Sequence, residues 1–158
     1  MPVASDADLL RLLAKGEIAL DPFREANLTP NGYDVTIAEV AVPSNGPPTT
    51  EGRAIVPPKS RFAVSTSEVL RLGPGVAAEI WLRTTWARRG VIASFGMVDS
   101  GFRGTLTLPA YNASDEELPI PIGETFAQVV FLLLTSASEK GYADRSGHYQ
   151  DQRGVRLR

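Results

Sequence analysis

Prolines punctuate the first third of the chain so densely that no long helix can form there. Seven of them lie between residues 22 and 58, at Pro22, Pro30, Pro43, Pro47, Pro48, Pro57 and Pro58. Proline lacks a backbone donor and clashes with the preceding turn of a helix, but it is compatible with short strands between turns. This part of the chain is therefore predicted to consist of β-strands and turns.

Short apolar and β-branched segments extend this pattern through the rest of the chain. They predict six strands separated by Gly, Pro, Asn and Asp, at residues 34–42, 61–69, 77–83, 90–97, 104–112 and 124–134. Residues 44–52 are predicted to form an exposed loop. One helix is expected at residues 6–15, with Ser5 as its N-cap and Gly16 as its stop signal. Such strands in a small domain are typical of a barrel or jelly roll.

The size of the chain limits it to one core. It has 158 residues, of which 43% are hydrophobic, and no internal repeat. We expect one β domain over residues 1–135. Residues 136–158 form a polar tail, which is expected to be mobile unless a ligand or a neighbouring chain orders it.

Charge and composition exclude several classes of partner. The net charge of −2 comes from interspersed acids and bases, so nucleic acid is not an expected partner. The chain has no Cys and only one histidine, His148, which excludes thiolate zinc sites and multi-histidine metal cages. No apolar segment is long enough to span a membrane and no signal peptide is evident, so we expect a cytoplasmic protein.

Residues 82–90 are rich in hydroxyl and guanidinium side chains, with the sequence Leu-Arg-Thr-Thr-Trp-Ala-Arg-Arg-Gly. Arginine presents a fork of donors that suits phosphate oxygens, and threonine hydroxyls can complete their coordination. The segment is thus a candidate anion site. A basic surface turn with β-favouring threonines explains the same composition.

A second segment, residues 95–106, places Asp99 on a bend with glycines on both sides and Phe102 three residues further on. Hydrolysis of a phosphate ester needs a carboxylate that orients or deprotonates water, and a bend can present one at the mouth of a pocket. An aspartate that caps a turn is the structural alternative.

In this order and separation, the two segments resemble the superfamily of dUTPases and dCTP deaminases. Further matches lie at residues 6–13, 18–22, 28–35 and 123–128, so the resemblance covers nearly the whole chain. Residues 91–95 and 108–114 are most similar to the archaeal dUTPases. The resemblance implies a mainly β fold, a distorted jelly roll or β-clip barrel with a short N-terminal helix. It also implies a homotrimer with active sites between subunits.

The resemblance also implies a role for each site residue. Asp99 would position the attacking water, and Arg88 would assist. Phe102 would pack on the deoxyribose, and the hairpin up to Tyr111 would contact the base. The phosphates would be bound by Arg83, Thr84, Thr85 and, from an adjacent subunit, Gln128. The tail would close as a lid and contribute Tyr142, His148, Gln152 and Arg153.

The position of Pro109 bears on the reaction. Deaminases of this superfamily use a glutamate on the strand after the bend, and Pro109 matches that position. Because proline cannot transfer a proton, we favour hydrolysis of dUTP to dUMP and pyrophosphate, with Mg²⁺ carried by the triphosphate rather than by protein ligands. A dCTP deaminase, a bifunctional enzyme and an inactive nucleotide-binding barrel are the alternatives.

Overall fold

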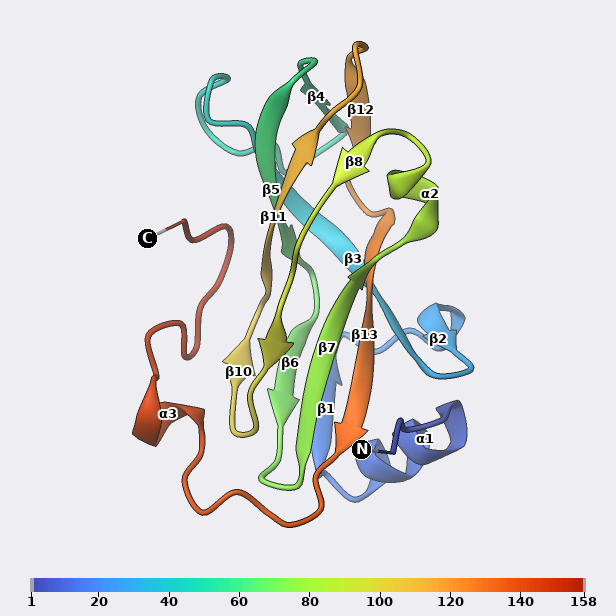
Figure 1. Cartoon of the computed structure of the whole chain (residues 1–158), viewed down its shortest axis with the longest axis vertical. Helices are drawn as coiled ribbons and strands as arrows, with labels where there is room; N and C mark the ends of the chain where they lie inside the picture. Colours follow the sequence, from blue (N-terminus) through green and yellow to red (C-terminus); the bar gives the residue numbers. More distant parts are fainter. Residues whose placement is uncertain (1, 158) are drawn as a thin grey trace.

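The computed structural model, which describes residues 2–157, is built around a curled antiparallel sheet (Figure 1). Its strands follow one another in the order β8 (Val91–Ile92), β11 (Thr107–Asn112), β5 (Ser60–Thr66), β3 (Gly32–Ala41), β13 (Thr125–Leu133), β7 (Val76–Leu82) and β9 (Met97–Val98), while β2 (Leu28–Thr29) pairs with β3. Only residues 93–96 separate the two edge strands, β8 and β9, so a single connection joins both edges. The mainly β class predicted from the sequence is confirmed.

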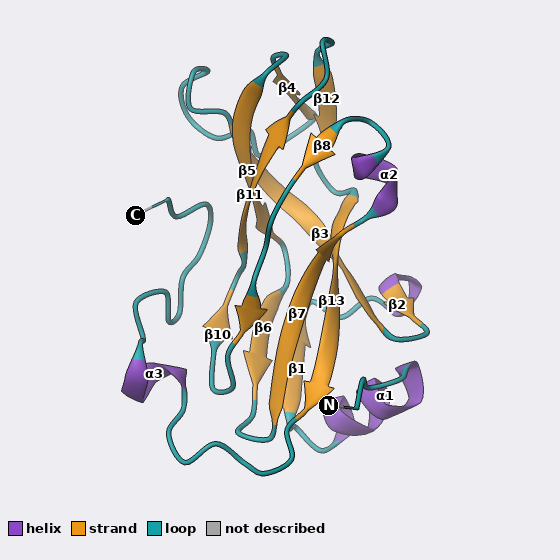
Figure 2. Ribbon diagram, viewed as in Figure 1, coloured by secondary structure: helices purple, strands orange, loops and turns teal. Residues whose placement is uncertain are grey.

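Two smaller sheets flank this one (Figure 2). The first contains β1 (Ile18–Asp21), β6 (Val69–Leu72) and β10 (Arg103–Gly104), and the second pairs β12 (Leu118–Pro121) with β4 (Arg53–Val56). They lie toward opposite ends of the molecule, so the bend that carries Asp99 and the turn that follows β11 are far apart.

The predicted N-terminal helix is confirmed as α1 (Asp6–Ala14). The Ser5 hydroxyl accepts a hydrogen bond from the Asp8 amide at 3.2 Å, and the Asp8 carboxylate accepts from the Ser5 amide in return, which forms a capping box. Leu9 and Leu12 are buried. The helix ends one residue before the predicted limit, because Lys15 is its C-cap.

Three of the six predicted strands are interrupted. In two of them backbone amides donate to partners outside the strand ladder, and in the third the central residues connect two sheet edges. Residues 61–69 divide into β5 and β6, since the Ser67 amide donates to the Thr36 carbonyl. Residues 104–112 divide into β10 and β11, since the amides of Thr105 and Leu106 donate to Gln152 and Thr66. Residues 90–97 form only β8 and β9, because their centre connects the two sheet edges.

Seven short elements lie outside the predicted helix and strands. They are β1, β2, β4, β12, the 3-10 helix η1 (Glu25–Asn27), α2 (Thr84–Ala87) and α3 (Tyr142–Arg145). The expected loop at residues 44–52 is confirmed as mostly exposed, although Thr49 forms a bridge with Val40. Among residues 2–157, no helix is both long enough and apolar enough to cross a bilayer.

An aromatic cluster in the core fixes α2 to the sheet. The buried rings of Trp86 and Phe126 have centroids 5.6 Å apart, and Phe62 meets Phe126 at 6.1 Å. The Trp86 indole also donates to the Thr125 carbonyl at 2.9 Å, which satisfies its N–H in the core. The cluster thereby sets the position of the Arg83 segment on β13.

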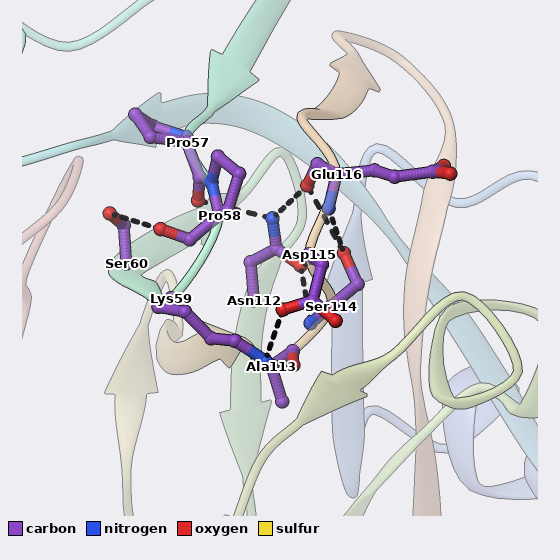
Figure 3. A network of polar contacts seen from close by, with 9 residues as sticks. All are labelled: Pro57, Pro58, Lys59, Ser60, Asn112, Ala113, Ser114, Asp115 and Glu116. Carbon is purple, nitrogen blue, oxygen red and sulfur yellow. Dashed lines mark hydrogen bonds and ion pairs between the residues drawn. The ribbon is translucent and has the colours of Figure 1, made fainter.

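Asn112 ties together the turn that follows β11 (Figure 3). Its side-chain nitrogen donates to the carbonyls of Val56, Pro57 and Glu116 at 3.2, 3.1 and 2.9 Å. Its side-chain oxygen accepts from the amide and the hydroxyl of Ser114. One buried amide side chain therefore joins three segments of the chain.

We expect Asn112→Ala to lower the free energy of unfolding by about 3 kcal/mol, because each buried carbonyl left without a donor costs roughly 1–3 kcal/mol. Chemical denaturation monitored by tryptophan fluorescence measures this change. Lys59→Ala is the control: it removes an exposed ion pair with Asp115 from the same network and should cost less than about 1 kcal/mol. Equal losses in the two variants would contradict the assigned role of Asn112.

Glu68 is a buried acid between β5 and β6. Its side chain is 1% exposed, one carboxylate oxygen accepts from the Thr36 amide at 2.8 Å, and the other oxygen has no partner. Burial raises the pKa of the Glu68 carboxyl, and the Thr36 hydrogen bond only partly opposes this.

The raised pKa predicts a stability difference that depends on pH. The stabilising contribution of protonated Glu68 is fully present below the unfolded-state pKa and is lost as pH rises through the higher folded-state pKa, by about 1.4 kcal/mol per pKa unit. Glu68→Gln keeps an acceptor for Thr36 and carries no charge. We therefore expect the variant to become more stable than the wild type as pH rises from about 4 to 8. Thermal unfolding across this range tests it, and parallel curves would contradict it.

Candidate functional site

Asp99 lies on an exposed bend directly after β9. The Phe102 amide donates to the Asp99 carbonyl at 3.2 Å, and Gly101 has a φ of +83°, which closes the bend. A cavity of about 280 Å³ opens beside it, and its walls include Phe102, Pro109 and Tyr142. Among the described residues that line this cavity, Asp99 alone carries a carboxyl group.

The tail lies along the bend and β10 of its own chain, instead of extending away. Gln152 is buried, and its side-chain amide donates to the Thr105 carbonyl at 2.6 Å. The Thr105 amide in turn donates to the Gln152 carbonyl at 3.1 Å, and Arg103 forms an ion pair with Asp151. The sequence predicts a tail that is mobile unless a ligand or a neighbouring chain orders it, and in the structure the tail packs through these contacts on its own chain.

The structure brings only some of the predicted tail residues to the cavity. Tyr142 meets the buried ring of Phe102 edge-on, with centroids 5.5 Å apart, and both rings line the cavity, as does Gln152. His148 is exposed, packs edge-on against Tyr149 and does not line it. Arg153 donates to the Gln152 carbonyl at 2.9 Å, beside the cavity lining.

A second cavity, of about 350 Å³, shares Asp99 and Tyr142 with the first. Lys140 and Arg145 line it, and Asp99 is again the one described acid in the lining. One carboxylate thus lies between a largely apolar cavity and a cationic one. The two cations were not predicted as site residues, although basic residues on either side of Tyr142 were the signal available in the sequence.

The Arg83 segment lies elsewhere on the chain. In Figure 1, α2 is at the upper right and the bend leading into β10 is at the lower left. Thr84, Thr85 and Arg88 are exposed on or beside α2, and neither they nor Arg83 line the two Asp99 cavities. The segment is a short helix rather than the predicted turn between strands.

Two further predicted residues are also remote from Asp99. Gln128, on β13, donates to the Thr29 hydroxyl at 2.7 Å. Tyr111, on β11, is half-exposed and lines a groove with Lys59 and Arg61 at the far end of the sheet. A single chain therefore does not bring Tyr111, Gln128 or the α2 residues to the Asp99 cavities.

Arg83 forms an ion pair with Asp34, its Nε lying 2.8 Å from the carboxylate oxygen, and also donates to the Thr125 hydroxyl. Burial raises the pKa of the Asp34 carboxyl, and the Arg83 charge opposes this. Within residues 2–157, no three His, Asp or Glu side chains converge as a metal cage. A carboxylate such as Asp99 is nevertheless a suitable oxygen ligand for a Mg²⁺ ion held mainly by phosphates.

Sequence comparisons place the chain among nucleotide enzymes. Residues 43–134 match a family model described as dCTP deaminase-like. A protein of Pyrococcus horikoshii named dCTP deaminase is 37% identical over 136 residues, which cover 85% of each chain. A probable deoxyuridine 5'-triphosphate nucleotidohydrolase of Sulfolobus islandicus rod-shaped virus 1 is 29% identical over 159 residues, which cover 98% of this chain and 97% of the viral protein.

Solved structures support the same fold. The dCTP deaminase of Agrobacterium tumefaciens matches with a TM-score of 0.70 and 14% identity over 83% of this chain, which spans 48% of the length of that protein. A mutant dUTPase from phage phi11 of S. aureus, a structure described as showing the coordination of a structural Mg(II) ion, matches with a TM-score of 0.55 and 15% identity. That match covers 78% of this chain and 94% of the phage protein.

Proposed function

The chain belongs to the family of the dCTP deaminases and dUTPases, and we propose that it hydrolyses dUTP to dUMP and pyrophosphate. One observation carries this proposal: Asp99 is the one acid among the described residues that line its cavity, while Pro109 lies in the cavity wall at the position where the family resemblance implies the glutamate of a deaminase. The site thus has a carboxylate that can orient a water molecule, whereas β11, the strand that contains Pro109, has no acidic residue.

In the proposed reaction Asp99 accepts a hydrogen bond from a water molecule and directs it at the α-phosphorus. A bond forms between the water oxygen and the α-phosphorus, and the bond from that phosphorus to the bridging oxygen breaks. The water proton passes to the carboxylate, and pyrophosphate leaves with the bond's electron pair. Phe102 and Tyr142 would hold the sugar and base, and Lys140 and Arg145 would offset phosphate charge.

Magnesium fits this site as a companion of the substrate. The phosphates of the substrate would carry the Mg²⁺ ion, and the Asp99 carboxylate lies at the cavity where that complex would bind. When bound, the ion would neutralise charge on the triphosphate. The residues of this chain would still bind the nucleotide, exclude water by means of the tail and orient the attacking water.

We further propose that the complete site forms in a homotrimer. The Arg83 segment lines neither Asp99 cavity and lies away from the bend between β9 and β10 (Figure 1), so a neighbouring subunit must supply this segment if one nucleotide contacts both. Exposed Trp81, Ile92 and Met97, on or beside the sheet edges, offer apolar surface for such a contact. A trimer acting on nucleotides is expected in the cytoplasm.

Deamination of dCTP is the second candidate, and the name of the Pyrococcus relative favours it. The two activities give different products from different substrates. Purified protein with Mg²⁺ is incubated separately with dUTP and dCTP, and pyrophosphate and ammonia are measured in both. We expect pyrophosphate from dUTP and no ammonia from dCTP; ammonia from dCTP, or no pyrophosphate from dUTP, would overturn the proposal.

A further inference from the structure

Residues 28–35 resemble the family in sequence but do not line the Asp99 cavities, and they contact two predicted phosphate ligands, Gln128 and Arg83. Thr29 accepts from the side chain of Gln128 at 2.7 Å. Gly32 lies so close to β13 that a Cβ atom there would be 2.6 Å from the Val129 carbonyl oxygen and 3.1 Å from Cγ of Gln128. A glycine is needed at this point because any side chain would displace β13.

Asp34 follows on the same strand and is paired with Gln128 across the sheet. Its carboxylate lies 2.8 Å from Nε of Arg83, and Nη1 of Arg83 donates to the Thr125 hydroxyl. The Asp34 side chain is 13% exposed and the Arg83 side chain is 36% exposed. The carboxylate is therefore largely shielded from solvent, while part of the Arg83 side chain remains accessible. Two strands, β3 and β13, thereby hold the guanidinium group from two directions.

The remaining donors of Arg83 are available to a ligand. A guanidinium group has five N–H donors in a rigid plane, and these contacts use one on Nε and one on Nη1. The donors left over can form a charge-assisted pair of bonds with a phosphate. Arginine side chains lose considerable conformational freedom when they bind, so a side chain that is already held in place binds more tightly.

We infer that Asp34 is a positioning residue, which holds Arg83 in the orientation that binds a phosphate of the nucleotide. This inference rests on the proposed function, since it assigns the ligand of Arg83 as the polyphosphate of a deoxynucleotide. It goes beyond that function because it gives Asp34, which is partly buried and does not itself contact the nucleotide, a role in binding it. Asp34 therefore affects binding of the triphosphate group and does not affect binding of the sugar or the base.

The test is Asp34→Asn, which keeps the size of the side chain and an acceptor oxygen but removes the charge. We expect the KM for dUTP and the dissociation constant for the triphosphate to rise about tenfold, with kcat changed by less than about threefold and the affinity for deoxyuridine unchanged. Asp115→Asn is the matched control, because it breaks the Lys59 ion pair far from Arg83 and should leave all values as they are. Thermal unfolding of each variant checks that the fold is intact.

A double variant separates positioning from general destabilisation. If Asp34 acts through Arg83, Asp34→Asn combined with Arg83→Gln should bind triphosphate no more weakly than Arg83→Gln alone. Independent, multiplying effects, or an equal loss of deoxyuridine affinity, would overturn the inference. The dissociation constants of dUTP and dCTP are measured at equilibrium and do not require turnover. The role of Asp34 in triphosphate binding can therefore be confirmed or rejected whether or not the protein hydrolyses dUTP.

Discussion

Asp99→Asn is expected to reduce kcat for dUTP hydrolysis by about a thousandfold while changing the dissociation constant for dUTP by less than about threefold. The asparagine amide has nearly the same shape as the carboxylate and leaves the bend unchanged. It cannot accept the proton of the attacking water, and its uncharged oxygen orients that water poorly. The loss should therefore appear in the chemical step and spare nucleotide binding.

Pyrophosphate release under saturating dUTP measures kcat, and calorimetric titration of the inactive variant measures affinity. Asp144→Asn is a suitable comparison, since Asp144 lies on α3 nearby and does not line either Asp99 cavity. Wild-type turnover in the Asp99 variant would remove this carboxylate from the reaction. A large loss of affinity without a loss of kcat would show that it binds substrate only.

Ending the chain after Glu139 is expected to lower kcat/KM for dUTP by about a hundredfold. This truncation removes Tyr142 from the face of Phe102 and Gln152 from the Thr105 backbone, so the cavity beside Asp99 loses one of its walls. Water then enters the site and the nucleotide is held less firmly. The barrel itself should persist, because its core strands lie before residue 135.

A chain that ends after Gly154 is the control for this truncation. It loses the contacts of Val155 with Glu39 and of Arg156 with Thr107, but keeps those of Tyr142 and Gln152. Its kcat/KM should stay within about threefold of the full chain. If the chain that ends after Glu139 retained full catalytic efficiency, the tail would have no part in the mechanism.

The sequence was sufficient to predict the β class and the helix, because both depend on local chemistry. Closely spaced prolines exclude long helices, and the capping box of α1 needs only Ser5 and Asp8. Strand continuity was harder to predict. The break at Thr105 and Leu106 depends on Gln152 and Thr66, which are distant in sequence, and alternation of apolar residues carries no information about such partners.

The candidate site likewise has residues that the sequence could predict and contacts that depend on residues far apart in the chain. Asp99, Phe102 and Tyr142 were named from the sequence, and the structure places all three at one cavity. Composition could not show that Arg83 would pair with Asp34, since 49 positions separate them and only the pairing of β13 with both β3 and β7 brings them together. Lys140 and Arg145 were missed because exposed cations are common in polar tails, so their positions on either side of Tyr142 were only a weak signal.

The close approach of Gly101 and Gly141 limits how the tail can move. A Cβ atom on Gly101 would lie 2.9 Å from both the Gly141 Cα and the Tyr142 nitrogen, so backbone touches backbone at this point. A side chain at Gly101 would push the two backbones apart, so this glycine lets the start of the tail lie directly against the bend that carries Asp99.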